Sequence, residues 1–141
     1  MYAVGIKREQ EGLSDFDIPL PEIKDKKDIL VKNLQAGICG SDRSIVQHHL
    51  FDMEENESLM CLGHEHFGRV EEIGEKVTGL KKGDYAVVTA RRGCNQCQSC
   101  FNNQSDMCFT GLFKERGLHK LHGFFTDYVV DPEEYIVKVP N

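Results

Sequence analysis

The chain has 141 residues, of which 40% are hydrophobic and 28% are charged, and its formal net charge is −6. This composition excludes a disordered chain, and no apolar run approaches the roughly 20 residues that a helix needs to cross a bilayer. The acidic balance argues against a nucleic-acid-binding surface, which would be basic. We therefore expect one soluble domain, and the lack of an N-terminal signal pattern favours the cytoplasm.

Strands are expected where apolar and β-branched residues alternate with polar ones. The first two predicted strands span residues 2–7 and 28–36, and the proline-containing stretch between them is predicted to be a loop. A short helix capped by Ser41 or Asp42 is expected to run to about residue 49. An acidic stretch over residues 52–57, either a surface loop or a frayed helix end, should follow it.

Further strands are expected over residues 66–73, 84–89, 124–130 and 135–139, with a cysteine-rich lobe before the last two. No long helix alternates with the strands, which argues against a doubly wound parallel sheet. The pattern favours a mainly β fold, a partly closed antiparallel barrel with short helices. Neither G-x-G-x-x-G nor a P-loop occurs, so these residues hold no recognisable phosphate-binding loop.

Four of the six cysteines are close in sequence: Cys94, Cys97, Cys100 and Cys108. A spacing of two residues lets a tight turn aim two sulfurs at one point, and four thiolates suit a tetrahedral structural zinc. An iron–sulfur cluster is the competing interpretation, although such runs usually carry a proline after a later cysteine and Phe109 stands there. The third interpretation is that the four cysteines are redox-active or unpaired thiols. The basic residues that flank the lobe are candidates to offset the thiolate charge: Arg91, Arg92, Lys114 and Arg116.

A second group of candidate ligands consists of Cys39 and the pair His64-Glu65. Cysteine, imidazole and carboxylate are the ligand types of an open catalytic zinc site. Glycines at positions 37, 40 and 63 would allow close approach of backbone and substrate. The spacing alone is a weak signal, because a lone cysteine is more often a small core residue, as we expect of Cys61.

Several motifs occur in a characteristic order: G-I-C-G-S-D at residues 37–42, L-G-H-E-H-F-G at 62–68, G-D-Y-A-V at 83–87, and then the four-cysteine lobe. Together they resemble the catalytic, GroES-like domain of the zinc-dependent medium-chain dehydrogenase/reductase family. Within that family, D-R-S-I-V at residues 42–46 and D-P-E-E-Y-I-V-K-V-P at 131–140 are most similar to the archaeal-type glucose 1-dehydrogenases.

The resemblance implies roles for individual residues. Cys39 and His64 match ligands of a catalytic zinc, and Glu65 matches a carboxylate that either binds the zinc or borders it. Ser41 matches a hydroxyl that contacts the substrate and relays its proton. Asp42 matches an acid that orients a ligand.

The resemblance also implies that the four lobe cysteines hold a structural zinc, and that His66 and Glu115 contact a sugar. Ala90 stands where a polar sugar contact can occur, which leaves the preference for glucose over another aldose open.

These roles predict the catalytic part, residues 1–141 with a zinc lobe at about 91–117, of a zinc-dependent NAD(P)-linked dehydrogenase. The expected reaction converts D-glucose to gluconolactone through a zinc-polarised alkoxide and hydride transfer to nicotinamide. A threonine, sorbitol or simple-alcohol dehydrogenase of the same family and a non-catalytic zinc module are the alternatives.

The resemblance further places the Rossmann nucleotide-binding domain, and with it most of the NAD(P) site, beyond residue 141. We therefore expect the 141 residues alone to bind one catalytic and one structural zinc without dehydrogenase activity. The expected partners are a sugar or polyol and, for the parent enzyme, further copies of itself, but neither nucleic acid nor a membrane.

Overall fold

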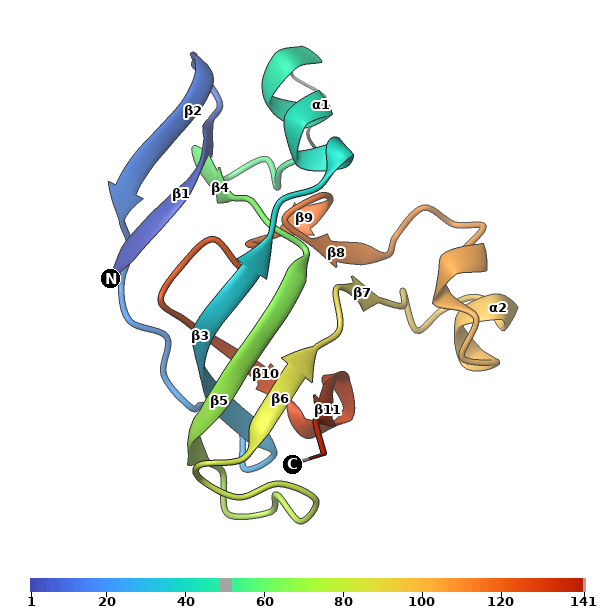
Figure 1. The fold of residues 1–141 in the computed structure, drawn as a ribbon. Helices are drawn as coiled ribbons and strands as arrows, with labels where there is room; N and C mark the ends of the chain where they lie inside the picture. The colour runs from blue at the N-terminus through green and yellow to red at the C-terminus, as the bar shows by residue number, and fades with distance from the viewer. Residues whose placement is uncertain (49–51, 141) are drawn as a thin grey trace.

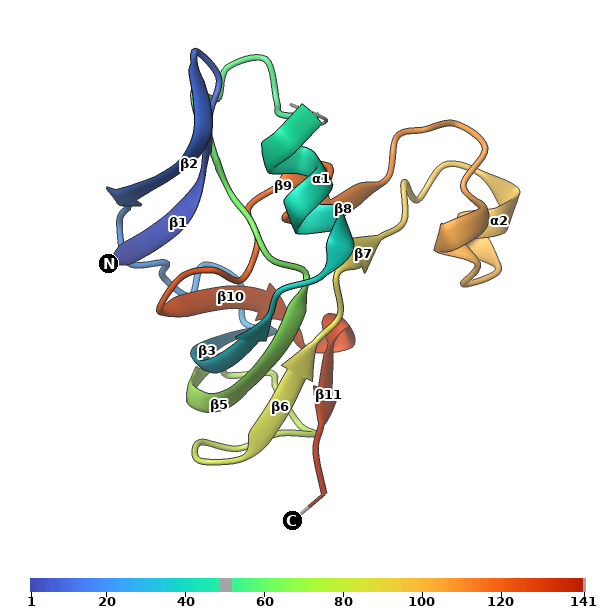
Figure 2. The same ribbon diagram turned by 45° about the horizontal axis from the view of Figure 1, so that its top comes forward.

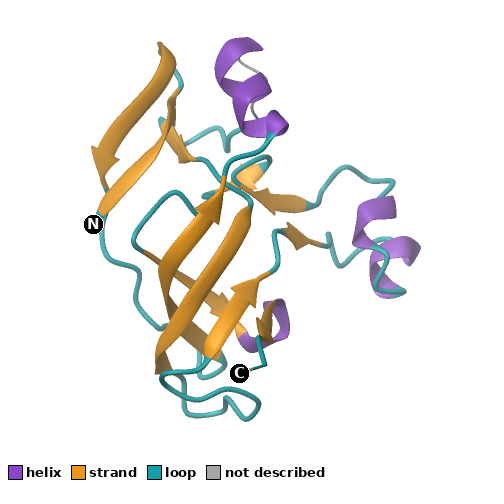
Figure 3. Ribbon diagram, viewed as in Figure 1, coloured by secondary structure: helices purple, strands orange, loops and turns teal. Residues whose placement is uncertain are grey.

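The computed structural model describes residues 1–48 and 52–140 and is built mainly from antiparallel strands (Figure 1 and Figure 3). The largest sheet has five strands in the order β10 (Tyr128–Pro132), β3 (Asp28–Gly37), β5 (Glu65–Ile73), β6 (Tyr85–Val88) and β11 (Ile136–Lys138). Each neighbouring pair is antiparallel, and the sheet curls into a half-barrel (Figure 2). The predicted mainly β, partly closed barrel is therefore confirmed.

The core of the half-barrel explains why these strands form where apolar residues alternate. Ile29 and Val31 of β3 point inward with no exposed surface, and Val70 of β5 meets them there. Successive residues of a strand face opposite sides of the sheet, so a period of two buries one apolar face. The strands expected over 28–36, 66–73 and 84–89 are found within one or two residues of those bounds.

A second sheet has the order β2 (Gln10–Asp17), β1 (Tyr2–Lys7) and β4 (Leu59–Cys61). The prediction of an uninterrupted loop between the first two strands was wrong, because residues 10–17 pair with β1 over its whole length. This strand depends on hydrogen bonds to its neighbour and carries little apolar sequence, which is why its pattern was weak. The prolines at positions 19 and 21 follow its end.

Helix α1 (Gly40–His48) begins at Gly40, so both predicted caps, Ser41 and Asp42, lie within its first turn instead of before it. The predicted final residue, 49, lies outside the described residues. Its buried side chains are Asp42 and Ile45, and Ile45 joins a second apolar cluster with Leu62 and Met60. None of the helices in residues 1–48 and 52–140 is long and apolar enough to cross a membrane.

The cysteine-rich lobe projects from the barrel (Figure 1). It contains α2 (Gln98–Phe101) and the 3-10 turn η1 (Ser105–Met107), and it is flanked by β7 (Arg91–Arg92) and β8 (Lys114–Arg116). Strand β9 (Lys120–Leu121) completes this small sheet by pairing in parallel with β8. Strands of two or three residues show no period, so the sequence did not predict them.

The segment after the lobe also departs from expectation. The strand expected over 124–130 begins only at Tyr128, and the 3-10 turn η2 (Glu133–Tyr135) precedes β11. Phe124 and Phe125 instead donate their backbone N–H groups to Gly63 and Leu62, at 2.9 and 2.8 Å. This segment therefore holds the chain just before β5.

A buried ion-pair network joins the lobe to the barrel. Asp131 Oδ2 on β10 accepts hydrogen bonds from Arg92 Nη2 and Arg116 Nε, both at 2.8 Å. The side chains of Arg92, Arg116 and Asp131 are only 10%, 8% and 7% exposed. Two of the four basic residues expected to balance the lobe are thus paired with a barrel carboxylate. The other two pair with Glu115 and Glu54.

Candidate metal centres

The register of the central sheet brings the first set of predicted ligands together. Strands β3 and β5 are antiparallel with Gly37 opposite Glu65, so the end of β3 lies beside the start of β5. Cys39 follows the end of β3, and His64 and Glu65 stand at the beginning of β5. Residues 25 positions apart in the chain therefore meet at one end of the half-barrel, next to the first turn of α1.

The side chains of Cys39, His64 and Glu65 converge on one point. Their ligand atoms all lie within 4.8 Å of one another. Cys39 Sγ is 2.9 Å from His64 Nε2 and 2.8 Å from Ser41 Oγ, and the hydroxyl is 3.3 Å from the same imidazole nitrogen. A thiol, an imidazole and a carboxylate are the donor types of an open zinc site, and the three lie close enough together for one ion to reach them all.

Asp42 supports this arrangement from behind. Its Oδ2 accepts a hydrogen bond from the backbone N–H of Cys39 at 2.9 Å, and its Oδ1 lies 3.4 Å from His64 Nδ1. Both Asp42 Oδ1 and His64 Nδ1 are buried and have no hydrogen-bond partner among the described residues. An ion on Nε2 fixes the imidazole proton on Nδ1, where this carboxylate oxygen faces it. The unpaired atoms therefore fit a metal-bound imidazole.

The glycine expected to allow close approach at position 37 does so. A Cβ atom built there would overlap the carboxyl group of Glu65, which folds over the end of β3. The surroundings of Gly40 are open, so the same argument does not apply to it.

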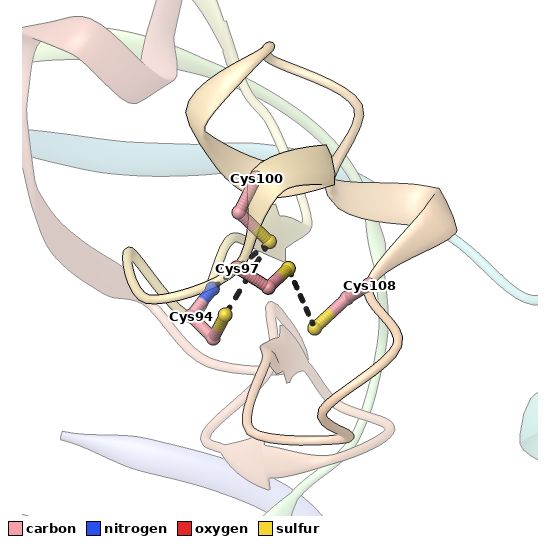
Figure 4. A group of neighbouring side chains, drawn as sticks. All are labelled: Cys94, Cys97, Cys100 and Cys108. Carbon is pink, nitrogen blue, oxygen red and sulfur yellow. Dashed lines mark hydrogen bonds between the residues drawn. The ribbon is translucent and has the colours of Figure 1, made fainter.

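The four lobe cysteines form the second centre (Figure 4). They come from the loop before α2, from α2 itself and from the end of η1, and their sulfurs point toward one another. All four sulfurs lie within 4.8 Å of one another, with Cys94 and Cys100 at 3.6 Å and Cys97 and Cys108 at 4.0 Å.

These separations fit a single ion. A tetrahedral zinc with bonds of about 2.3 Å places its sulfurs about 3.8 Å apart. In a four-iron cluster each cysteine binds a different iron, so the sulfurs must spread around the cluster. The hydroxyl of Thr110, 3.3 Å from Cys108 Sγ, lowers the pKa of that thiol and so favours the thiolate that binds metal.

The structure places His66 inside the barrel. The side chain is 7% exposed, Nε2 lies 2.7 Å from Asn33 Oδ1, and Nδ1 accepts the backbone N–H of Val88 at 3.1 Å. Burial, with a smaller contribution from Arg116, lowers the pKa of His66 to about 4. Both ring nitrogens already have partners, which favours a structural role, and contact with a sugar stays a prediction.

Glu115 lies on β8, where its carboxylate pairs with Arg91 at 2.8 Å. It is outside the two groups of side chains in the described residues that could hold a metal ion, and its role as a sugar contact also stays a prediction. Cys61 is fully buried as expected, and burial raises the pKa of its thiol to about 12.

The family profile of the alcohol dehydrogenase GroES-like domain matches residues 25–141. A glucose 1-dehydrogenase of Methanocella arvoryzae is 33% identical over 136 residues, which are 96% of this chain and 37% of that protein. A glucose 1-dehydrogenase of Picrophilus torridus is 40% identical over 79% of this chain and 31% of its own.

The structure of Haloferax mediterranei glucose dehydrogenase in complex with NADP, Zn and gluconolactone superposes with a TM-score of 0.87 at 30% identity, covering 99% of this chain and 39% of that one. The present chain therefore spans less than two fifths of the length of each of these relatives.

Proposed function

The chain belongs to the family of alcohol dehydrogenase GroES-like domains, and we propose that it is the catalytic domain of a zinc-dependent, NAD(P)-linked dehydrogenase that oxidises a sugar hydroxyl. The observation that carries the proposal is the convergence of Cys39, His64 and Glu65 at one end of the half-barrel. The relatives named as glucose dehydrogenases support D-glucose as the substrate and gluconolactone as the product. The thiolates need a reducing compartment, for which we propose the cytoplasm.

Two sets of side chains would hold zinc. Cys39, His64 and Glu65 would hold the catalytic ion, and the four lobe cysteines would hold the structural one. Zinc in the first site supplies a Lewis acid that lowers the pKa of a substrate hydroxyl. The nicotinamide, bound mainly outside these 141 residues, supplies the hydride acceptor.

The chain's own residues then position groups and move a proton. Asp42 Oδ1 faces His64 Nδ1 at 3.4 Å and would accept its proton in a hydrogen bond when the ion binds Nε2, which keeps Nε2 directed toward Cys39 Sγ. Ser41 Oγ, 2.8 Å from Cys39 Sγ, is placed to accept the proton that leaves the substrate hydroxyl and to pass it toward solvent. Glu65 is the exposed member of the three candidate ligands.

Metal content per chain tests the site. The wild-type chain should contain two zinc ions, and His64→Ala should contain one while retaining its fold. Cys97→Ser should lose the lobe zinc and much of its stability, because structural zinc contributes directly to folding free energy. A wild-type chain that binds only one zinc, held by the lobe, would favour the non-catalytic zinc module instead.

Substrate profiling tests the chemistry. In an enzyme that carries these residues beside a nucleotide-binding domain, His64→Ala should lower kcat/KM for D-glucose by at least a hundredfold with unchanged protein stability. Strong activity on sorbitol, threonine or simple alcohols beside little activity on aldoses would replace glucose by one of those substrates. It would leave the zinc-dependent mechanism in place.

A further inference from the structure

Gly63, the residue before the candidate ligand His64, is tightly packed. Gly63 is buried and has a φ of +90°, in the region that favours glycine. A Cβ atom built on it would lie 2.7 Å from Cε1 of the Phe125 ring and closer still to Cδ1. A side chain at position 63 would therefore overlap the ring.

A second glycine packs against it from the turn between β8 and β9. Gly117 has a φ of +69°, and a Cβ atom built on it would lie 2.7 Å from the backbone nitrogen of Gly63 and 2.8 Å from its carbonyl carbon. The next residue in the turn, Leu118, packs on the apolar cluster that contains Leu62. The turn therefore contacts residue 63 through the backbone of Gly117 and the cluster around Leu62 through the side chain of Leu118.

A third contact holds the same two residues. The backbone N–H of Gly123 donates to Cys61 at 2.7 Å, and a Cβ atom built on Gly123 would lie 2.5 Å from the carbonyl carbon of Leu62. The backbone N–H of Phe124 also donates to the carbonyl group of Gly63 at 2.9 Å, so residues 61–63 contact the chain on both sides of β9.

From these contacts we propose that Gly117 is a positioning residue for the metal ligand His64. The inference rests on the proposed function, because it takes Cys39, His64 and Glu65 to be a zinc site. The imidazole lies 2.9 Å from Cys39 Sγ and 3.4 Å from Asp42 Oδ1, and Gly117 packs directly against the backbone of Gly63, the residue that precedes His64. A Cβ at position 117 pushes that peptide away and turns the imidazole out of the ligand set.

The position of Gly117 is itself fixed. Arg116, the residue before it, is bonded to Asp131 and donates to the carbonyl groups of His122 at 2.8 Å and Val130 at 3.0 Å. Because Val130 and Asp131 belong to β10 of the barrel, the turn cannot easily move away when its contact with Gly63 becomes too tight.

The test compares Gly117→Ala with Gly83→Ala. Gly83 also has a positive φ, +92°, but a Cβ atom there would meet nothing within 4 Å. It lies just before β6, at the opposite end of the barrel from α1 (Figure 1). The control thus reproduces the backbone strain of an alanine at positive φ without the contact on Gly63.

Zinc affinity is measured by titration in competition with a chromophoric chelator, which should show one binding phase for each site. The phase that His64→Ala abolishes is assigned to the catalytic site. Gly117→Ala should weaken that phase at least tenfold, the usual range for a residue that orients a ligand, and leave the lobe site within twofold of wild type. Gly83→Ala should leave both phases within twofold.

Equal weakening of both sites, or no weakening in a folded Gly117→Ala, would overturn the inference. If circular dichroism shows Gly117→Ala to be unfolded, the zinc affinity of Phe125→Leu is the deciding measurement. That variant loosens the packing around Gly63 by removing the ring and introduces no clash. A weaker catalytic phase in that variant supports the inference, and an unchanged phase refutes it. A wild-type chain without a His64-dependent phase would instead refute the proposed function.

Discussion

Replacing Asp131 with asparagine removes the charge that joins the lobe to the barrel while preserving the size of the side chain. Asp131 Oδ2 is bonded to Arg92 and to Arg116, and all three side chains are buried. Burial lowers the pKa of Arg116 and the charge of Asp131 opposes that shift, so the carboxylate is what makes two buried guanidinium groups tolerable. The amide of asparagine carries no compensating charge.

The expected loss of stability depends on which hydrogen bonds Arg92 and Arg116 keep when the carboxylate is removed. Breaking a buried ion pair by removing one partner typically destabilises a protein by about 3–5 kcal/mol. Arg116 keeps its bonds to the carbonyl groups of His122 and Val130, so we expect the lower end, about 3 kcal/mol. Unfolding entropy of about 2 cal/mol/K per residue gives about 0.3 kcal/mol/K for this chain, and therefore a fall of about 10 °C in Tm.

The assay is thermal and urea unfolding of the zinc-loaded chain followed by circular dichroism, with metal content measured before each run. The matched control is Glu75→Gln, which breaks the ion pair with Lys26 at 2.9 Å, where the side chains are 78% and 63% exposed. That variant should unfold with the midpoint of wild type, because exposed pairs contribute little. If Asp131→Asn unfolds with the midpoint of Glu75→Gln, the reasoning from burial is wrong.

Three further predictions concern other sites. Burial lowers the pKa of His122, so the unfolded chain binds more protons just below pH 6.5. Stability should therefore rise with pH up to about 6.5 and level off above it. The rise should be shallower in unfolding curves of His122→Gln but not absent, because buried His66, whose pKa is lowered to about 4, contributes to it as well. Burial also raises the pKa of Cys61 to about 12, so peptide mapping after iodoacetamide treatment at pH 8 should find Cys61 unmodified until the chain is unfolded, whereas rapid labelling of the native chain would contradict this. Finally, urea unfolding of Cys97→Ser should show a loss of several kcal/mol and His64→Ala almost none, and equal losses would mean that the two metal sites do not differ in kind.

The parts of the fold that the sequence predicted are those with enough residues to show a period. Strands β3 and β5 have ten and nine residues, and their buried positions alternate well enough to be recognised. Strand β2 alternates too, but its inward-facing side chains are only partly buried, and its pairing with β1 provides most of its hydrogen bonds. Strands β7 and β9 have two residues each and exist only because their partners hold them.

The candidate ligands could be predicted because their chemistry is visible in their residue types, whereas the packing that places them is not. Nothing in the sequence around Gly117 indicates that it touches Gly63, and Arg92 lies 39 positions before the carboxylate that neutralises it. Both contacts depend on the three-dimensional register of strands far apart in the chain. We therefore expect a substitution at Gly117 to weaken the catalytic site and one at Asp131 to lower stability, in both cases without changing a ligand, and inspection of the ligand motifs alone would miss both effects.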